Sequence, residues 1–122
     1  MISVSEAELI HDILIEKFGG SKGLRDRSLL ESALNRPYQT FDKHELYPST
    51  IEKAAALFES LIINHPFIDG NKRISYFLMA LLLKQHGINI TASQTEKYDF
   101  VILASKGEFR FNQIREWLIN HT

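Results

Sequence analysis

Hydrophobic positions recur every three to four residues along most of the chain, and this period predicts helices rather than strands. The first predicted helix begins at Ser3, which has capping-box spacing with Glu6, and ends at Gly19–Gly20. A second, short helix is expected within residues 23–37, with Asp26 or Ser28 as its cap. The apolar faces of these two helices contain Leu9, Ile10, Ile13, Leu14 and Phe18, and Leu29, Leu30, Ala33 and Leu34.

The middle of the chain predicts two longer helices separated by a short loop. The first begins at Pro48–Ser49 and runs to Asn64, because Pro66 disfavours helical geometry at the residue before it. The second runs from Asn71 to His86. Between Ile74 and Leu83 it is apolar on almost every side, which predicts that it is the buried central helix of the fold.

The remaining segments complete a mainly helical pattern. Ser93 and Glu96 have capping-box spacing ahead of another helix, and Phe111–His121 is amphipathic. Residues 38–47 lack a helical period and predict an extended loop or a short β hairpin. We therefore expect an all-α or mainly α fold, a compact bundle of about six helices around a buried central helix, with residues 1–122 as one domain.

Composition excludes several classes of protein. The chain has 122 residues and a net charge of −1, so we expect no direct contact with nucleic acid. It has no cysteine, which excludes disulfides, thiolate catalysis and zinc sites with Cys ligands. The N-terminus does not resemble a signal peptide, and the longest apolar run, Tyr76–Leu83, is too short to span a bilayer. These features predict a cytoplasmic protein without a membrane partner.

Most of the candidate chemistry lies in the loop between the two central helices, NHPFIDGNKRIS. The N–H groups that open a helix bind phosphate well, and Gly70 would let the backbone approach such a ligand closely. Lys72 and Arg73 add positive charge, while a divalent cation would explain the acidic Asp69 beside an anion. His65 supplies a side chain that exchanges a proton near neutral pH. The loop therefore has the groups needed to transfer a phosphate-containing group to a hydroxyl.

Each residue also has an ordinary structural explanation. His65–Pro66 is typical of a turn, and Asp69–Asn71 is typical of a turn or a helix cap. The Asn71 side chain can contact either phosphate or the backbone of its own loop. Lys72 and Arg73 could simply be solvated, although cations at a helix start oppose the helix dipole. The combination of all these residues in one loop favours a site.

The same loop resembles the Fic/Doc family. Residues 65–73 match its motif, His-x-Phe-x-(Asp/Glu/Ala)-(Gly/Ala)-Asn-(Gly/Lys)-Arg, without a mismatch. Residues 23–37, 46–62 and 106–118 are similar to the Doc (death-on-curing) toxin branch. Adenylyltransferases of the family usually have Gly at the position of Lys72 and a second Arg at the position of Tyr76. The residues present here therefore favour the Doc branch.

The resemblance implies a toxin of a toxin–antitoxin pair that transfers phosphate from ATP to a Ser or Thr hydroxyl. In the Doc branch the acceptor is a threonine of elongation factor Tu, and translation is arrested. We therefore expect elongation factor Tu or another translation protein as the substrate. The resemblance assigns His65 as the general base and Asp69 as the Mg²⁺ ligand that also helps to position the acceptor. Phosphate would be held by Gly70, Asn71, Lys72 and Arg73, and Phe67 would be a buried structural residue.

The resemblance also implies two protein partners. Residues 38–47 correspond to a flap that aligns the target, with Phe41, Leu46 and Tyr47 as candidate docking residues. The chain lacks the inhibitory motif Ser/Thr-x-x-x-Glu-Gly/Asn, so inhibition is expected from an antitoxin whose disordered tail folds on binding. This tail would need an apolar groove. The first helix and the Leu29–Leu34 helix would form its walls, unless their apolar faces are simply part of the core.

Two alternatives remain open at this stage: AMP transfer to a protein hydroxyl, and a catalytically inactive binding module. Outside the loop, Arg25–Asp26 is interpreted as an ion pair or a cap, and Trp117 as core. The other histidines lack the spacing of metal ligands and are expected at the surface or as satisfied interior residues; they are His11, His44, His86 and His121.

Overall fold

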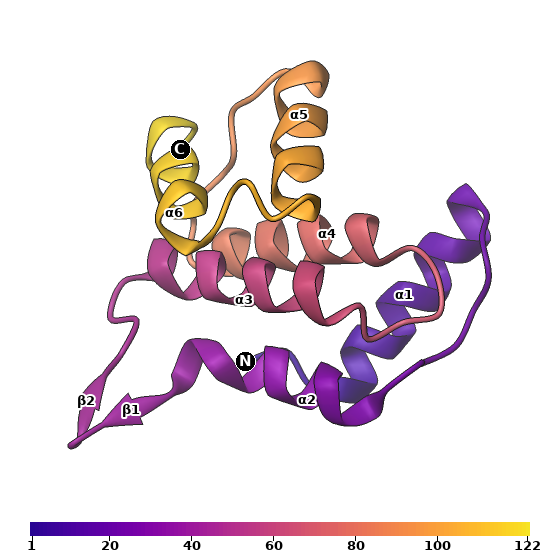
Figure 1. Cartoon of the computed structure of the whole chain (residues 1–122), viewed down its shortest axis with the longest axis horizontal. Coiled ribbons are helices and arrows are strands. Elements are labelled where there is room, and N and C mark those ends of the chain that lie inside the picture. Colours follow the sequence, from indigo (N-terminus) through magenta and orange to yellow (C-terminus); the bar gives the residue numbers. More distant parts are fainter.

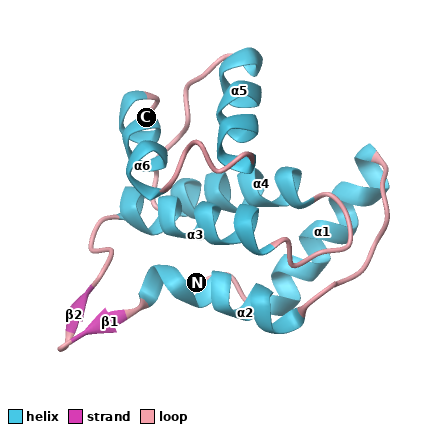
Figure 2. Ribbon diagram, viewed as in Figure 1, coloured by secondary structure: helices cyan, strands magenta, loops and turns pink.

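The computed structural model describes residues 1–122 and confirms the mainly α architecture with a small hairpin (Figures 1 and 2). No helix in the structure combines the length and the hydrophobicity that a bilayer-spanning helix needs. In chain order the elements are α1 (Val4–Phe18), α2 (Arg27–Asn35), the 3₁₀ turn η1 (Arg36–Tyr38), β1 (Thr40–Phe41), β2 (His44–Glu45), α3 (Thr50–Asn64), α4 (Asn71–Gln85), α5 (Gln94–Ser105) and α6 (Phe111–Asn120).

Helix starts follow the local capping signals. Ser3 and Ser93 form the two predicted capping boxes, and Ser49 forms a third with Glu52. Asp26, rather than Ser28, caps α2 by accepting a hydrogen bond from Leu29 N. Each cap satisfies N–H groups that have no partner within the helix, so the serine or aspartate fixes where the helix begins.

The most enclosed helix is α3, whereas the sequence predicted this place for 71–86. α3 packs against α2, α4, α5 and α6, and its Ala54–Ala56 run is fully buried. Small side chains let neighbouring helices approach closely from several sides, which hydrophobicity alone does not reveal. α4 runs antiparallel beside α3 (Figure 1). It buries one face, but Phe77 on its other side is 42% exposed.

The predicted β hairpin is present and projects from the helical body (Figure 1). Thr40 pairs with Glu45 and Phe41 with His44, while the turn residues Asp42 and Lys43 both have positive φ angles, 50° and 66°. These angles suit the two-residue hairpin turn, although such turns usually contain Asn or Gly.

A nearly buried carboxylate connects the base of the hairpin to α3 and α6. Glu59 accepts hydrogen bonds from Arg36 Nη1 at 2.8 Å, Arg110 Nε at 3.0 Å and Phe111 N at 2.7 Å. Burial by itself would raise the pKa of Glu59, but the hydrogen bonds from the two arginines outweigh it and lower the pKa. Arg36 also donates through Nε to the Tyr47 hydroxyl at 3.1 Å, so the network holds the end of the hairpin segment.

The apolar face of α2 belongs to the core, so it does not form a wall of the groove expected between α1 and α2. On α2, Leu30, Ala33 and Leu34 are at most 3% exposed, so the alternative that this face is core holds. The exposed apolar residues of α1 are Leu9, Ile13 and Phe18. An apolar cavity of about 450 Å³ opens instead between α1 and α4, lined mainly by Ile10, Ile13, Leu14, Phe18, Tyr76 and Phe77.

Candidate functional site

The site is built where the loop between α3 and α4 lies against the connection between α1 and α2. Ile68 N donates to Gly23 O at 3.0 Å, and the N–H groups of Arg25 and Asp26 both donate to Pro66 O, at 2.8 and 3.0 Å. Leu24 and Phe67 form an isolated antiparallel bridge. These backbone bonds hold residues 65–70 in one conformation, with the ring of Phe67 buried beneath the loop as expected.

His65 ends α3 in the left-handed conformation, with φ 48° and ψ 57°. Its ring is exposed, and Nδ1 lies 3.1 Å from Ile63 O. Because a carbonyl oxygen can only accept, Nδ1 carries the proton in this hydrogen bond, which leaves the lone pair on Nε2. Nε2 has no partner in the structure and is therefore available to accept a proton.

Arg25, in the connection between α1 and α2, holds the C-terminal end of α3. Its Nη2 donates to Asn64 O at 2.6 Å and its Nε to His65 O at 2.8 Å. A cation here satisfies two terminal carbonyls and complements the negative end of the helix dipole. Of the two interpretations of Arg25–Asp26, the structure supports caps for both residues, since Asp26 caps α2 and no ion pair joins them.

Asp69 presents an ionised carboxylate at the centre of the site. Hydrogen bonds from the backbone N–H of Ser21 to Oδ2, 3.0 Å, and of Gly70 to Oδ1, 2.8 Å, lower the pKa of Asp69. The charge of Arg73 lowers it further. The side chain is exposed, so its oxygens can accept additional contacts from solvent or a ligand.

Gly70 and Asn71 form the start of α4. Gly70 adopts φ 73°, and a Cβ there would lie 3.1 Å from Ile15 Cδ1, so both conformation and space favour glycine. The Asn71 side chain accepts from Phe67 N at 3.0 Å and donates to Phe67 O at 2.9 Å. Of the two predicted contacts of Asn71, its side chain therefore makes the one with its own loop.

The first turn of α4 has backbone donors without partners. The N–H groups of Asn71, Lys72 and Arg73 make no hydrogen bond within the protein. The Lys72 side chain is exposed. Arg73 donates through Nη1 to Gly19 O at 3.4 Å, and its guanidinium lies 4.9 Å from the centre of the Phe18 ring. This arrangement provides N–H donors and two cations around one space, which suits an anion such as phosphate.

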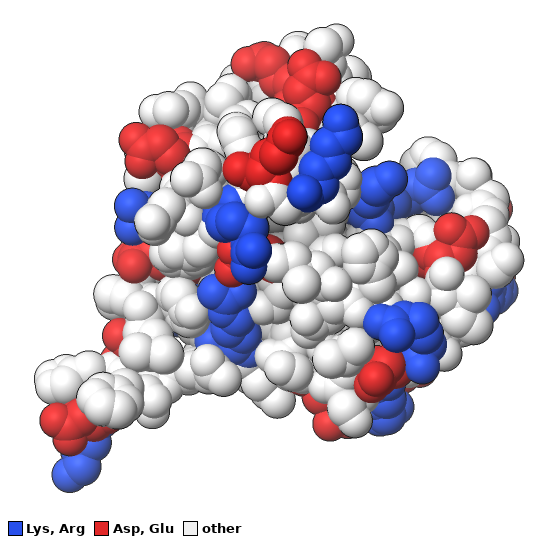
Figure 3. Space-filling model, in the orientation of Figure 1, with Lys and Arg blue, Asp and Glu red and all other residues white.

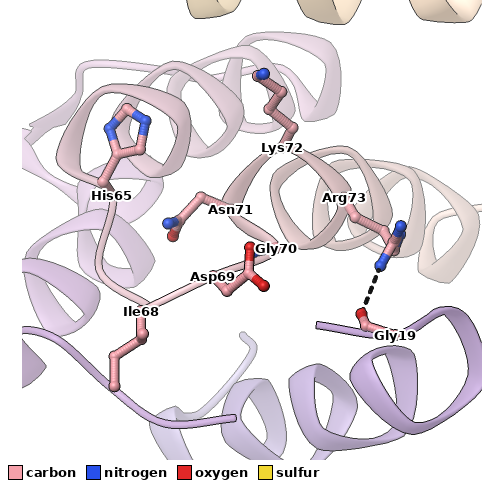
Figure 4. A pocket seen from close by; sticks show the side chains of 8 residues that line it. All are labelled: Gly19, His65, Ile68, Asp69, Gly70, Asn71, Lys72 and Arg73. Carbon is pink, nitrogen blue, oxygen red and sulfur yellow. Dashed lines mark hydrogen bonds between the residues drawn. The ribbon is translucent and has the colours of Figure 1, made fainter. Parts of the chain in front are cut away.

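One cavity of about 470 Å³ brings the predicted residues together (Figure 4). The Asp69 carboxylate lies between His65 on one side and Arg73 on the other. The hairpin residues Phe41, Leu46 and Tyr47 do not line it. A neighbouring cavity of about 390 Å³ shares Lys72 and Arg73 and extends between α4 and α5. The first cavity is lined by Gly19, His65, Ile68, Asp69, Gly70, Asn71, Lys72 and Arg73.

The donor set fits a cation that completes its coordination from a ligand. No group of three or more His, Asp or Glu residues could hold a metal ion without help. The exposed and ionised Asp69 can supply one carboxylate, and Mg²⁺ commonly binds through one or two carboxylates together with substrate phosphates and water.

Sequence reasoning did not find the contacts that come from the α1–α2 region. Gly19, Ser21 and Arg25 each bond to a residue of the site, and His11 contacts the loop from α1. The partners are 39 to 58 positions apart in the chain. Periodicity and spacing report only on near neighbours, so no local signal could have paired them.

On the face seen in Figure 3, acidic and basic side chains are interspersed.

Comparison with known proteins adds an independent observation. A family model described as the Fic/DOC family matches residues 1–83. The protein named Toxin Doc from Mycolicibacterium smegmatis is 40% identical over 75 residues, which is 62% of this chain and 58% of that relative. The Protein kinase doc of Escherichia phage P1 is 27% identical over 117 residues, 96% of this chain and 91% of the relative.

Similarity also extends to a second named activity. The Protein adenylyltransferase Fic of Drosophila yakuba is 36% identical over 92 residues, covering 72% of this chain but only 18% of the fly protein. The chain thus spans little more than half of the mycobacterial relative and a small part of the fly relative, but nearly all of the phage protein.

Proposed function

This chain belongs to the Fic/DOC family, and from that premise we propose that it is the toxin of a toxin–antitoxin pair and acts as a protein kinase. It transfers the γ-phosphate of ATP to a Ser or Thr hydroxyl, with elongation factor Tu as the expected target and arrested translation as the result. The observation that supports this best is one cavity bordered by an exposed imidazole, an ionised carboxylate and the unpaired amides of a helix start.

In the proposed reaction, Nε2 of His65 takes the proton of the acceptor hydroxyl while the hydroxyl oxygen forms a bond to the γ-phosphorus. The bond between that phosphorus and the bridging oxygen breaks, and ADP leaves with the electron pair. The N–H groups that open α4, together with Lys72 and Arg73, donate to the phosphate oxygens where negative charge is concentrated. His65 then releases the proton to water, because its ring is exposed.

Asp69 would hold Mg²⁺ at the site. The ion, when bound, neutralises phosphate charge. Two backbone N–H groups keep the carboxylate ionised and fixed in orientation before any ligand arrives. The role proposed for Asp69 therefore requires little rearrangement of the loop.

Tyr76 supports phosphate transfer over AMP transfer. In the adenylyltransferases that the chain resembles, this position usually carries a second Arg, which holds the γ-phosphate. Here the position holds Tyr76, whose phenol has no positive charge to offer a phosphate; burial raises its pKa to about 12. AMP transfer is the second candidate, because the fly relatives are named adenylyltransferases; the relative that aligns over 96% of this chain is named a kinase.

The hairpin is the proposed docking site for the target protein. Phe41 is 76% and Leu46 47% exposed, and both project from a segment whose outer backbone edge is unpaired. Tyr47 is only partly exposed, and its hydroxyl accepts from Arg36. We therefore propose that Phe41 and Leu46 contact the target, while Tyr47 holds the hairpin in place.

The antitoxin is proposed to cover the apolar cavity between α1 and α4. Its lining is mainly hydrophobic, and Arg73 borders both this cavity and the phosphate cavity. A segment folded there would therefore reach the catalytic region. Phe77→Glu places a charge in the cavity away from the motif and is expected to weaken antitoxin binding while phosphate transfer continues.

Labelled ATP separates these possibilities. Purified protein is incubated with elongation factor Tu, Mg²⁺ and ATP labelled at either the α- or the γ-phosphate. We expect only the γ-label on the target, and a loss of about 10²- to 10⁴-fold in rate for His65→Ala, the usual contribution of a general base. A urea midpoint equal to wild type is the folding control. Transfer of the α-label would instead establish AMP transfer, and transfer of neither label would support a binding module.

A further inference from the structure

His11 is a buried polar residue whose position the proposed reaction does not yet explain. It lies on α1 and is 1% exposed. The other two buried polar side chains are paired, Glu59 with three donors and Ser75 with Asn71 O. In contrast, Nδ1 of His11 has no hydrogen-bond partner and is the single buried side-chain nitrogen or oxygen in this state. An unpaired buried polar atom destabilises the fold, so an apolar residue would serve a purely structural position better.

The paired side of the ring contacts the loop that carries the site. Nε2 lies 2.7 Å from Asp69 O, and the imidazole stacks on the Phe67 ring with centroids 3.9 Å apart and planes 9° apart. The Asp69 carbonyl can only accept, so Nε2 carries the proton and Nδ1 the unpaired lone pair. His11 thus contacts both Phe67 and Asp69 from outside the loop.

The bond to the carbonyl fixes the orientation of the whole peptide between Asp69 and Gly70. A trans peptide is planar, and its C=O and N–H point in opposite directions. With the carbonyl directed at His11, the Gly70 N–H is directed away from α1 and donates to Asp69 Oδ1 at 2.8 Å. The same peptide immediately precedes the amides that open α4. The orientation of this peptide therefore determines where the Asp69 carboxylate points and where the N–H groups at the start of α4 lie.

We propose that His11 is a positioning residue for phosphate transfer. By holding this peptide, it presents the Asp69 carboxylate and the first-turn N–H groups of α4 to the phosphates of the nucleotide. The inference rests on the proposed function, since it assigns His11 a role in that reaction. It differs from a role in core packing, because it depends on the Nε2–H donor rather than on the volume of the ring.

Two substitutions separate the donor from the ring. His11→Phe keeps an aromatic ring for stacking on Phe67 but has no donor, and it also removes the unpaired Nδ1. His11→Gln has no ring, but its amide can donate in place of Nε2–H. Ile114→Val, a truncation of a buried residue on α6, is a control for a modest loss of core packing outside the cavity. Each variant is assayed for kcat, KM for ATP and Mg²⁺ dependence, with a thermal melt of each protein.

We expect His11→Phe to melt close to wild type and to lose about 10- to 100-fold in kcat/KM, the usual loss when a residue that orients a metal ligand is removed. His11→Gln should recover most of this loss, and Ile114→Val should retain wild-type kinetics. Wild-type kcat/KM in His11→Phe would overturn the proposal. Equal losses in the Phe and Gln variants would also overturn it, because the donor would then not matter.

An amide spectrum makes this test independent of the proposed function. The Gly70 N–H resonance reports its bond to Asp69, so it should shift in His11→Phe and remain near its wild-type position in His11→Gln. If wild-type protein transfers no phosphate, the proposed function fails, whatever the spectra show. If it is active and the Gly70 resonance is unchanged in His11→Phe, the positioning role of His11 fails while the function stands.

Discussion

Replacing Asn71 with alanine should destabilise the loop rather than remove a contact to phosphate. The Asn71 amide supplies a partner for both Phe67 N–H and Phe67 O, and neither group has another. Phe67 itself is 2% exposed, so solvent has limited access to the orphaned groups. Asn71→Ala therefore removes two hydrogen bonds and leaves a donor and an acceptor unsatisfied on the same buried residue.

The size of the effect follows from these two groups. A typical hydrogen bond contributes about 1 kcal/mol net, and an unsatisfied buried group costs about 1–3 kcal/mol. Because the two bonds are only partly buried, we expect a loss of about 2–3 kcal/mol in the free energy of unfolding. This is below the typical stability of a domain of about 5–15 kcal/mol, so the variant should remain folded.

Urea unfolding followed by the fluorescence of Trp117, the one tryptophan of the chain, measures this loss. With urea slopes of about 1–3 kcal/mol per M, a loss of about 2–3 kcal/mol lowers the midpoint by about 0.7–3 M. Lys72→Ala is the matched control, since it removes a cation from the same cavity without touching Phe67. It should weaken ATP binding at an unchanged midpoint. If Asn71→Ala instead loses ATP affinity at a wild-type midpoint, the side chain binds phosphate and our assignment is wrong.

Three further predictions test the hairpin, the buried carboxylate and the glycines beside Asp69. Replacing Lys43 with Gly relieves a left-handed conformation and should stabilise the hairpin by up to about 1 kcal/mol, measured as slower amide exchange; faster exchange would contradict this. The pKa of Glu59 is lower folded than unfolded, so its stabilisation is present above its ordinary pKa and is lost as pH falls through the folded value. Glu59→Gln should cost about 3 kcal/mol at pH 7 and flatten the acid limb of stability against pH, and parallel limbs would refute the assignment. A Cβ at Gly20 would lie 2.7 Å from Asp69 Oδ2, whereas one at Gly19 meets nothing within 4 Å, although both have positive φ. Gly20→Ala should therefore weaken Mg²⁺-dependent ATP binding severalfold more than Gly19→Ala; equal losses would indicate backbone strain alone.

Much of the fold was predictable because its signals are local. A few neighbouring residues determine each of three features: the capping boxes at Ser3 and Ser93, the loop at Pro66 and the hairpin within 38–47. The structure confirms all of them. The family was predictable for the same reason, since the motif is contiguous. The central position of α3 was not, because it depends on how closely other helices approach Ala54–Ala56.

The sequence motif singled out residues that line one cavity, but it did not predict how they are held. The motif placed His65 and Asp69 in one cavity, as the structure does. The contacts of Ser21, Arg25 and His11 with that loop join positions far apart in the chain, and they form because α1 and the α1–α2 connection lie against the loop. A single sequence contains no signal for such long-range contacts.

The loop divides its polar groups between building itself and meeting a ligand. The Asn71 amide and the Nδ1 of His65 are used within the protein, on Phe67 and Ile63 respectively. The groups left without partners are Nε2 of His65 and three successive N–H groups of α4. These groups lie at the surface of one cavity, where water can be displaced by a ligand, and together they suit one with both a hydroxyl proton to lose and several acceptor oxygens. A hydroxyl approaching a phosphate supplies both, whereas a carboxylate or a neutral metabolite supplies only one.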